Sequence, residues 1–95
     1  MRGDIQAFYP STTQVVAYTG TSAASSNAFS DDTRLVRVVA TTDCHITFAG
    51  TPTATTSHPF LPANTVEYFI VNGGQKIAAI RSAVSGNLYV TEMTK

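Results

Sequence analysis

Residues 59–80 are PFLPANTVEYFIVNGGQKIAAI, and this stretch decides the fold class. Residues 66–71 (VEYFIV) place apolar side chains on both faces of an extended segment, as successive strand residues point in opposite directions. Residues 72–74 (NGG) tolerate the positive φ that a tight hairpin turn requires. Residues 77–81 (IAAIR) then form a returning strand. The stretch therefore predicts two β-strands joined by a tight hairpin turn.

Further strands are predicted on both sides of this stretch. In residues 43–49 the apolar Cys44, Ile46 and Phe48 alternate with polar residues, so these three side chains are expected to face the core. Residues 33–41 carry apolar groups on both faces, which is typical of a strand covered on two sides. A second turn at residues 85–87 leads to the last strand, and the last three strands are expected to form a meander. The segments expected as strands are 13–18 (TQVVAY), 33–41 (TRLVRVVAT), 43–49 (DCHITFA), 66–71 (VEYFIV), 77–81 and 88–92.

The connecting segments are rich in small, polar and proline residues. Residues 19–32 form a loop with Phe29 as its apolar anchor, and a short strand is expected within it around residues 27–30. Residues 50–64 form a long connection stiffened by three prolines. Residues 1–12 are expected to be an N-terminal arm or an edge strand, and residues 13–95 a single β-sandwich domain.

The fold class expected is all-β, with no helix. Ser and Thr are abundant while the common helix formers Leu, Glu and Lys are scarce. Six to eight short strands in 95 residues indicate a compact antiparallel β-sandwich that is jelly-roll-like. Without tryptophan or a cysteine pair, the immunoglobulin signature is absent.

Composition narrows the function classes. Charged residues are 13% of the chain and the net charge is zero, which favours a surface partly covered by a partner, since a lone soluble protein normally carries net charge. Six scattered Lys and Arg residues argue against nucleic-acid binding, and no apolar run is long enough to cross a membrane. The single Cys44 and the absence of a signal-peptide pattern predict a chain made and kept in a cytoplasm.

No catalytic residue, metal ligand or cofactor site is expected. Asp43, His45 and His58 come nearest to a metal set, but a site needs three or four converging donors and no fourth is apparent, so solvated polar residues are the favoured interpretation. Cys44 points away from the adjacent His45 on a strand and cannot form a nucleophile–base pair with it. Residues 31–32 (DD) are interpreted as turn-capping carboxylates. We therefore expect a binding or structural protein and not an enzyme.

Residues 14–93 resemble a family of small virion accessory proteins of tailed bacteriophages. The resemblance is carried by VAYT, VRVVATTDCHITF, PFLPANTVEYF, GQKIA and LYVTE, and by AGTPTAT, where the family pattern has NPTAT and this chain has Thr51 before the proline. Such proteins are similar to head decoration (cement) proteins, which coat an icosahedral capsid. The pattern is one of scaffold residues without a chemical motif.

The resemblance implies a structural protein that stabilises a phage capsid by binding between major capsid protein subunits. It implies assembly in the host cytoplasm, a final location on the capsid surface, and self-association as a dimer or trimer. The residues expected to contact the capsid are Ile5, Phe8, Tyr9, Thr51, Pro52, His58, Pro59 and Phe60. For Ile5, Phe8 and Tyr9 the alternative interpretation is an ordinary edge strand that covers the core. For His58 and Phe60 it is a loop anchored on the core.

A second function from a different class stays open at this point. The chain has four tyrosines, Tyr9, Tyr18, Tyr68 and Tyr89, and together they could form an aromatic platform for sugars. The alternative is therefore a receptor- or glycan-binding domain of a phage head or tail fibre.

Overall fold

The computed structural model describes residues 8–94, and within that range it holds eight β-strands and no helix. No segment of this range forms a helix that could cross a membrane. The predicted all-β class is confirmed. The strands are β1 (Tyr9–Tyr18), β2 (Ala23–Ala24), β3 (Leu35–Ala40), β4 (Cys44–Ala49), β5 (Phe60–Leu61), β6 (Glu67–Ile70), β7 (Lys76–Arg81) and β8 (Gly86–Thr94).

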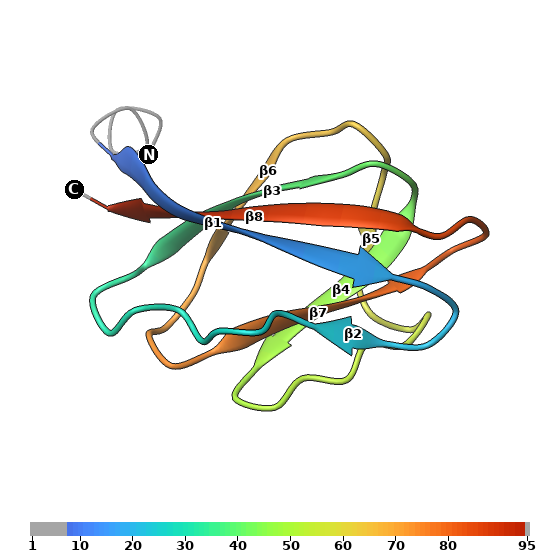
Figure 1. Ribbon diagram of the computed structural model, residues 1–95, viewed down its shortest axis with the longest axis horizontal. Coiled ribbons are helices and arrows are strands. Elements are labelled where there is room, and N and C mark those ends of the chain that lie inside the picture. The colour runs from blue at the N-terminus through green and yellow to red at the C-terminus, as the bar shows by residue number, and fades with distance from the viewer. Residues whose placement is uncertain (1–7, 95) are drawn as a thin grey trace.

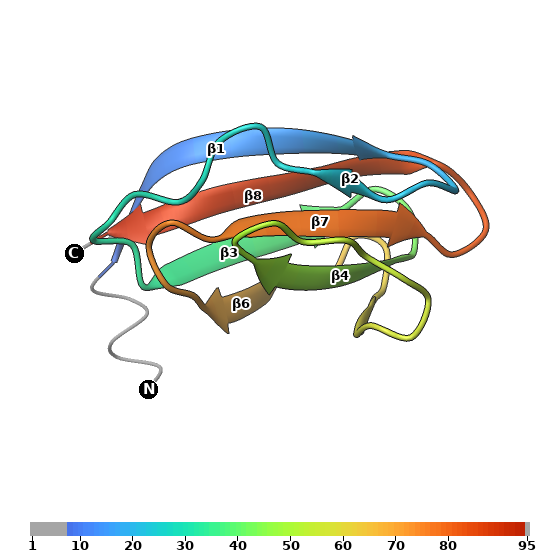
Figure 2. The same ribbon diagram turned by 90° about the horizontal axis from the view of Figure 1, so that it is seen from below.

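The strands form two antiparallel four-stranded sheets that pack face to face. Sheet A has the strand order β1-β8-β3-β6 and sheet B the order β2-β7-β4-β5. Figure 1 shows sheet A above sheet B, and Figure 2, turned by 90°, shows β2, β7 and β4 in front of the strands of sheet A. The chain is a β-sandwich, as expected from the sequence.

The strand pairing is nested, because the chain is folded back on itself once. β1 pairs with β8, β2 with β7, β3 with β6 and β4 with β5, all antiparallel. The connection between β4 and β5 is therefore the tip of one long hairpin. Rolling this hairpin up adds the β3–β8 and β4–β7 pairs and separates it into two sheets. This is the pattern of a jelly roll.

The predicted hairpin at residues 66–81 and the predicted C-terminal meander are both wrong. β6 belongs to sheet A, β7 to sheet B and β8 again to sheet A, so these consecutive strands do not pair. The turn has positive φ at Gly74 (87°) and an N–H of Gln75 that donates to the Asn72 carbonyl at 3.3 Å. Positive φ at the third turn position alone is the pattern of a type II turn. Type II turns splay the flanking strands, whereas paired hairpin strands favour primed turns.

The turn at residues 72–75 is held by the preceding loop and not by strand pairing. The Phe29 N–H donates to the Gln75 carbonyl at 2.8 Å, and the Gly74 N–H donates to the Phe29 carbonyl at 2.9 Å. A Cβ at Gly73 would lie 2.6 Å from the Asp31 carbonyl oxygen. Glycine is required at this position because the loop backbone approaches so closely.

The core fills the space between the sheets. Sheet A contributes alternate residues of β1, β3 and β8, and sheet B contributes alternate residues of β4 and β7. The inward orientation predicted for Cys44, Ile46 and Phe48 is confirmed, with Phe48 packed against the core from its margin. Phe29 is 2% exposed and is the loop anchor that was predicted. The buried core side chains are Val16, Tyr18, Phe29, Val36, Val38, Ala40, Cys44, Ile46, Leu61, Val71, Ile77, Ala79, Leu88 and Val90.

Three local predictions differ from the structure. The strand expected at residues 13–18 begins earlier, because β1 starts at Tyr9 and continues through a register shift between Pro10 and Thr13. Residues 9–12 thus form part of an edge strand, which was one of the two alternatives for residues 1–12. The short strand of the first loop is β2 at Ala23–Ala24 and not at residues 27–30. The two-residue strand β5 was not predicted. Two-residue strands carry too little pattern to be found without their pairing partners.

Side-chain hydrogen bonds connect neighbouring segments at each end of the sandwich. At one end, the Tyr18 hydroxyl donates to the Thr42 carbonyl at 2.7 Å, and the Thr42 hydroxyl donates to the Val84 carbonyl at 2.8 Å. At the other end, one carboxylate oxygen of Glu92 accepts from the Ser30 N–H at 3.0 Å and from the Thr33 hydroxyl at 2.6 Å. Glu92 is 4% exposed, so these contacts are shielded from water.

Candidate functional site

The outward side of sheet A presents an apolar surface, which we call the outer face. The cross-strand pairs Val15–Tyr89, Val39–Tyr89 and Arg37–Tyr68 place these side chains on the same side of the sheet. The inward residues of the same strands fill the core. The outer face comprises Val15 of β1, Leu35, Arg37 and Val39 of β3, Val66 just before β6, Tyr68 and Ile70 of β6, and Tyr89, Thr91 and Met93 of β8.

The outer face concentrates exposed apolar area. Of the eight large hydrophobic side chains found exposed in residues 8–94, five lie here. Scattered apolar residues on a surface need no explanation, but a contiguous group rimmed by polar residues marks an interaction site. The five are Val15 (55% exposed), Val66 (44%), Tyr68 (38%), Ile70 (70%) and Tyr89 (44%).

The size of the outer face can be worked out from sheet geometry. Four strands about 4.8 Å apart, with outward residues spanning about 20 Å along each, give a flat area of roughly 400 Å². Each partner contributes roughly 500 Å² to the smallest stable protein interfaces. Because Leu35, Thr91 and Met93 are buried within the chain, the open part of the outer face is smaller than this area, and adjoining surface must supply the rest of a specific contact.

Arg37 is the one charged side chain of the outer face. It is half-buried on β3, between Tyr68 on one neighbouring strand and Thr91 on the other. Within residues 8–94, its guanidinium makes no hydrogen bond and no ion pair. No acidic side chain accompanies it on the outer face, because Glu67 and Glu92 alternate to the other side of their strands.

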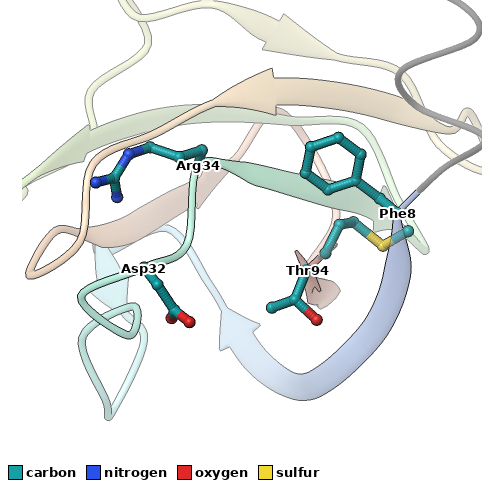
Figure 3. A pocket seen from close by; sticks show the side chains of 5 residues that line it. Phe8, Asp32, Arg34 and Thr94 are labelled. Atoms are coloured by element: carbon teal, nitrogen blue, oxygen red, sulfur yellow. The ribbon is translucent and has the colours of Figure 1, made fainter.

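A cavity of about 470 Å³ adjoins one end of the outer face. It is lined by Phe8, Asp32, Arg34, Met93 and Thr94, and Figure 3 shows the Phe8 ring beside the sulfur-bearing side chain with Thr94 just below, and Asp32 and Arg34 across from them. The Arg34 guanidinium donates to the carbonyl oxygens of Asp31 at 2.8 Å and Thr33 at 3.0 Å, so its position is set by the backbone. Its lining side chains bring together one carboxylate, one guanidinium and one hydroxyl, those of Asp32, Arg34 and Thr94.

The two segments predicted to contact a capsid lie at opposite corners of the sandwich. Tyr9 pairs with Thr94 at one end of sheet A, whereas Phe60 pairs with His45 near the other end, in sheet B. Figure 1 shows the start of β1 and the strand β5 far apart. They do not form one surface.

The exposure of the predicted contact residues varies. Tyr9 is 69% and Phe60 52% exposed, Thr51 and Pro59 are exposed, Phe8 and His58 are half-buried, and Pro52 is buried within the chain. Ile5 lies outside the described residues. A buried Pro52 has no surface open to a partner.

The polar residues weighed as metal ligands have structural partners. One Asp43 oxygen accepts from the Ala63 N–H at 2.8 Å, and Nδ1 of His45 lies 2.8 Å from the His58 carbonyl oxygen. Nδ1 of His58 accepts from the Thr55 N–H at 2.9 Å. In the range 8–94 there is no group of three or more His, Cys, Asp or Glu side chains placed to hold a metal ion.

Cys44 is a buried thiol. Desolvation by burial raises its pKa from 9.0 to about 11, a hydrogen bond from Tyr18 acts in the opposite direction, and the Asp43 carboxylate adds to the rise. A thiol with a raised pKa and no exposed surface is protonated at neutral pH and unreactive. Cys44 is thus a core residue.

The outer face was not among the contact sites predicted from the sequence. The signal that could have found it is the alternation of Val66, Tyr68 and Ile70 together with an arginine in the middle of the most apolar strand. The alternation shows that two faces exist, but which of them looks outward depends on the sheet to which each strand belongs.

Comparison with protein-family models, with curated proteins and with solved structures finds no match to this chain.

Proposed function

We propose that this protein is a structural virion component that decorates and stabilises a bacteriophage capsid by binding between major capsid protein subunits through its outer face. The observation that carries the proposal is the contiguous exposed apolar surface of sheet A. The resemblance of residues 14–93 to phage virion accessory proteins supplies the identity of the assembly. The protein's task is to bury area and not to perform chemistry.

The physical properties of the chain support a role on a large particle. Burial of apolar area stabilises contacts by about 25 cal/mol per Å², and a face of the size derived above gives a modest contact for a single copy. Many copies on one lattice strengthen retention, because neighbouring contacts raise the effective concentration of each molecule. Zero net charge is tolerated when the protein is held on a particle and does not need to remain dispersed alone.

The proposal is tested by co-sedimentation of the purified protein with capsid shells of the phage that encodes it. The wild-type protein is expected to pellet with the shells and to saturate. Ile70→Asp, which puts a charge on the outer face, is expected to abolish pelleting. Val84→Asp is the matched control, because Val84 is 62% exposed and lies in the connection between β7 and β8, away from the outer face. Failure of the wild-type protein to bind shells would refute the proposal.

The number of copies per virion provides an independent check. Quantitative mass spectrometry of purified virions should find the chain in hundreds of copies if it coats the shell. Six or twelve copies would instead assign it to the tail or the portal.

Glycan binding is the second candidate, and the observation that favours it is the presence of Tyr68 and Tyr89 on one exposed face. Aromatic rings exposed on a sheet can stack on sugar rings. Binding to a glycan array that is lost in both Tyr68→Ala and Tyr89→Ala would support this function over capsid decoration.

A further inference from the structure

Arg37 is the single charged side chain of an otherwise apolar sheet face, and it is half-buried there. Its side chain emerges from the middle of β3, flanked by Tyr68 of β6 and Thr91 of β8, within a face that is otherwise uncharged. Its stem can cover apolar neighbours, but its guanidinium carries five N–H donors that need acceptors. Those donors find no acceptor among residues 8–94.

From this arrangement we infer that Arg37 is the specificity anchor of the outer face, and that its guanidinium binds a carboxylate on the protein partner. The inference rests on the function proposed above and identifies the chemistry of the contact. The partner surface is apolar with an Asp or Glu near its centre. A planar guanidinium matches a carboxylate with two parallel hydrogen bonds, and arginine is enriched among the residues that dominate interface energies.

Charge distribution favours a different protein over a second copy of this chain. Arg37 lies on the third of four strands and near the middle of the face, so a two-fold axis through the face would bring two guanidiniums together without a carboxylate between them. A nucleic acid or an anionic membrane would need a cluster of basic residues, and the outer face has one. A shell subunit with a carboxylate in an apolar patch meets both requirements.

The first arm of the test uses the free protein and needs no partner. Arg37→Met keeps an unbranched apolar stem and removes the charge, and Arg81→Met makes the same change at the exposed end of β7 in sheet B. If Arg37 is reserved for a partner, Arg37→Met leaves the urea midpoint of unfolding unchanged or raises it. A midpoint lowered relative to the wild-type protein would mean that Arg37 is paired within its own chain, and this would overturn the inference. Asp4 is the one acidic residue of the sequence that precedes the described range. The same urea measurement on Asp4→Asn tests whether its carboxylate pairs with Arg37.

The second arm measures binding to capsid shells by co-sedimentation. Arg37→Met is expected to weaken binding by at least about tenfold, because it leaves the partner carboxylate buried without its charge partner. Arg81→Met is expected to stay within about twofold of the wild-type protein, since exposed charges contribute little. Equal binding by wild type and Arg37→Met would overturn the inference and leave the proposed function intact.

Failure of the wild-type protein itself to bind shells would refute the proposed function. It would also exclude the shell as the partner of Arg37. Sedimentation equilibrium of the wild-type protein tests whether a second copy of this chain occupies the outer face instead. A dimer that Ile70→Asp dissociates would assign the outer face to a second copy of this chain and would overturn the inference.

Discussion

Replacing Cys44 with alanine is expected to remove an alkaline loss of stability from this protein. The thiol is fully buried, and its pKa is raised from 9.0 to about 11, chiefly by desolvation. Between those two values the unfolded chain has released the thiol proton while the folded chain still holds it. Proton binding by the Cys44 thiol then favours the folded state. The contribution of this thiol to the free energy of unfolding is therefore complete below pH 9 and declines as the pH rises towards 11.

The size of this effect follows from the two pKa values. A difference of two pH units corresponds to about 2.7 kcal/mol, and this is the expected loss in the free energy of unfolding. The free energy of unfolding of Cys44→Ala should be about 1 kcal/mol lower than that of the wild-type protein below pH 9, because a small core group is removed. It should not show the alkaline decline that the Cys44 thiol causes.

Urea unfolding of both proteins between about pH 8 and about pH 11 measures the effect. The wild-type curve should fall towards and then below that of Cys44→Ala, and groups that titrate in both proteins cancel in the difference. Two curves that remain parallel over this range would refute the reasoning. They would show that the Cys44 thiol is ionised as readily in the folded chain as in the unfolded one.

Three substitutions test the packing. Gly86→Ala should lower the free energy of unfolding by about 2 kcal/mol, because the added Cβ would collide with the hydroxyl network at that end of the sandwich, whereas Gly50→Ala, with open space around its Cβ, should have little effect. Glu92→Ala should cost about 3 kcal/mol by leaving two shielded donors unpaired. Ile77→Ala should cost about 2–5 kcal/mol, and Ile70→Ala less than about 0.5 kcal/mol, as judged from urea midpoints.

Each of these predictions has an outcome that contradicts it. A harmless Gly86→Ala would mean that the hydroxyl network can shift without cost. An unaffected Glu92→Ala would mean that water replaces the carboxylate. Equal losses at Ile77 and Ile70 would mean that β6 does not expose its outward face, and the outer face as described would not exist.

Strand positions could be predicted from the sequence because the signal is local. The alternation in residues 43–49 correctly placed β4 and oriented Cys44, Ile46 and Phe48 towards the core. Phe29 was correctly predicted as an anchor, because it is the one large apolar residue in a loop of small polar ones. These features depend only on neighbours in the chain and on the two-residue repeat of a strand.

Strand pairing could not be predicted in the same way. The residue types at Asn72, Gly73 and Gly74 are equally compatible with two turns. One is a hairpin turn, and the other is a type II turn that joins two sheets. The choice between them depends on φ at each position and on the loop at residues 29–31, which contacts the turn from a distant part of the chain. The relative positions of the candidate contact residues could not be predicted for the same reason, since Tyr9 and Phe60 lie in different sheets.

The order of residues along this chain was sufficient to specify an all-β protein, its main strands and a core built from their alternate side chains, because each of these depends on contacts within a few residues. The nested pairing, the identity of the outward side of sheet A and the isolated position of Arg37 on it arise from contacts between segments far apart in the chain. Hydrophobic alternation assigns side chains to two faces of a strand, but a face becomes core or surface only when the other sheet covers one of them.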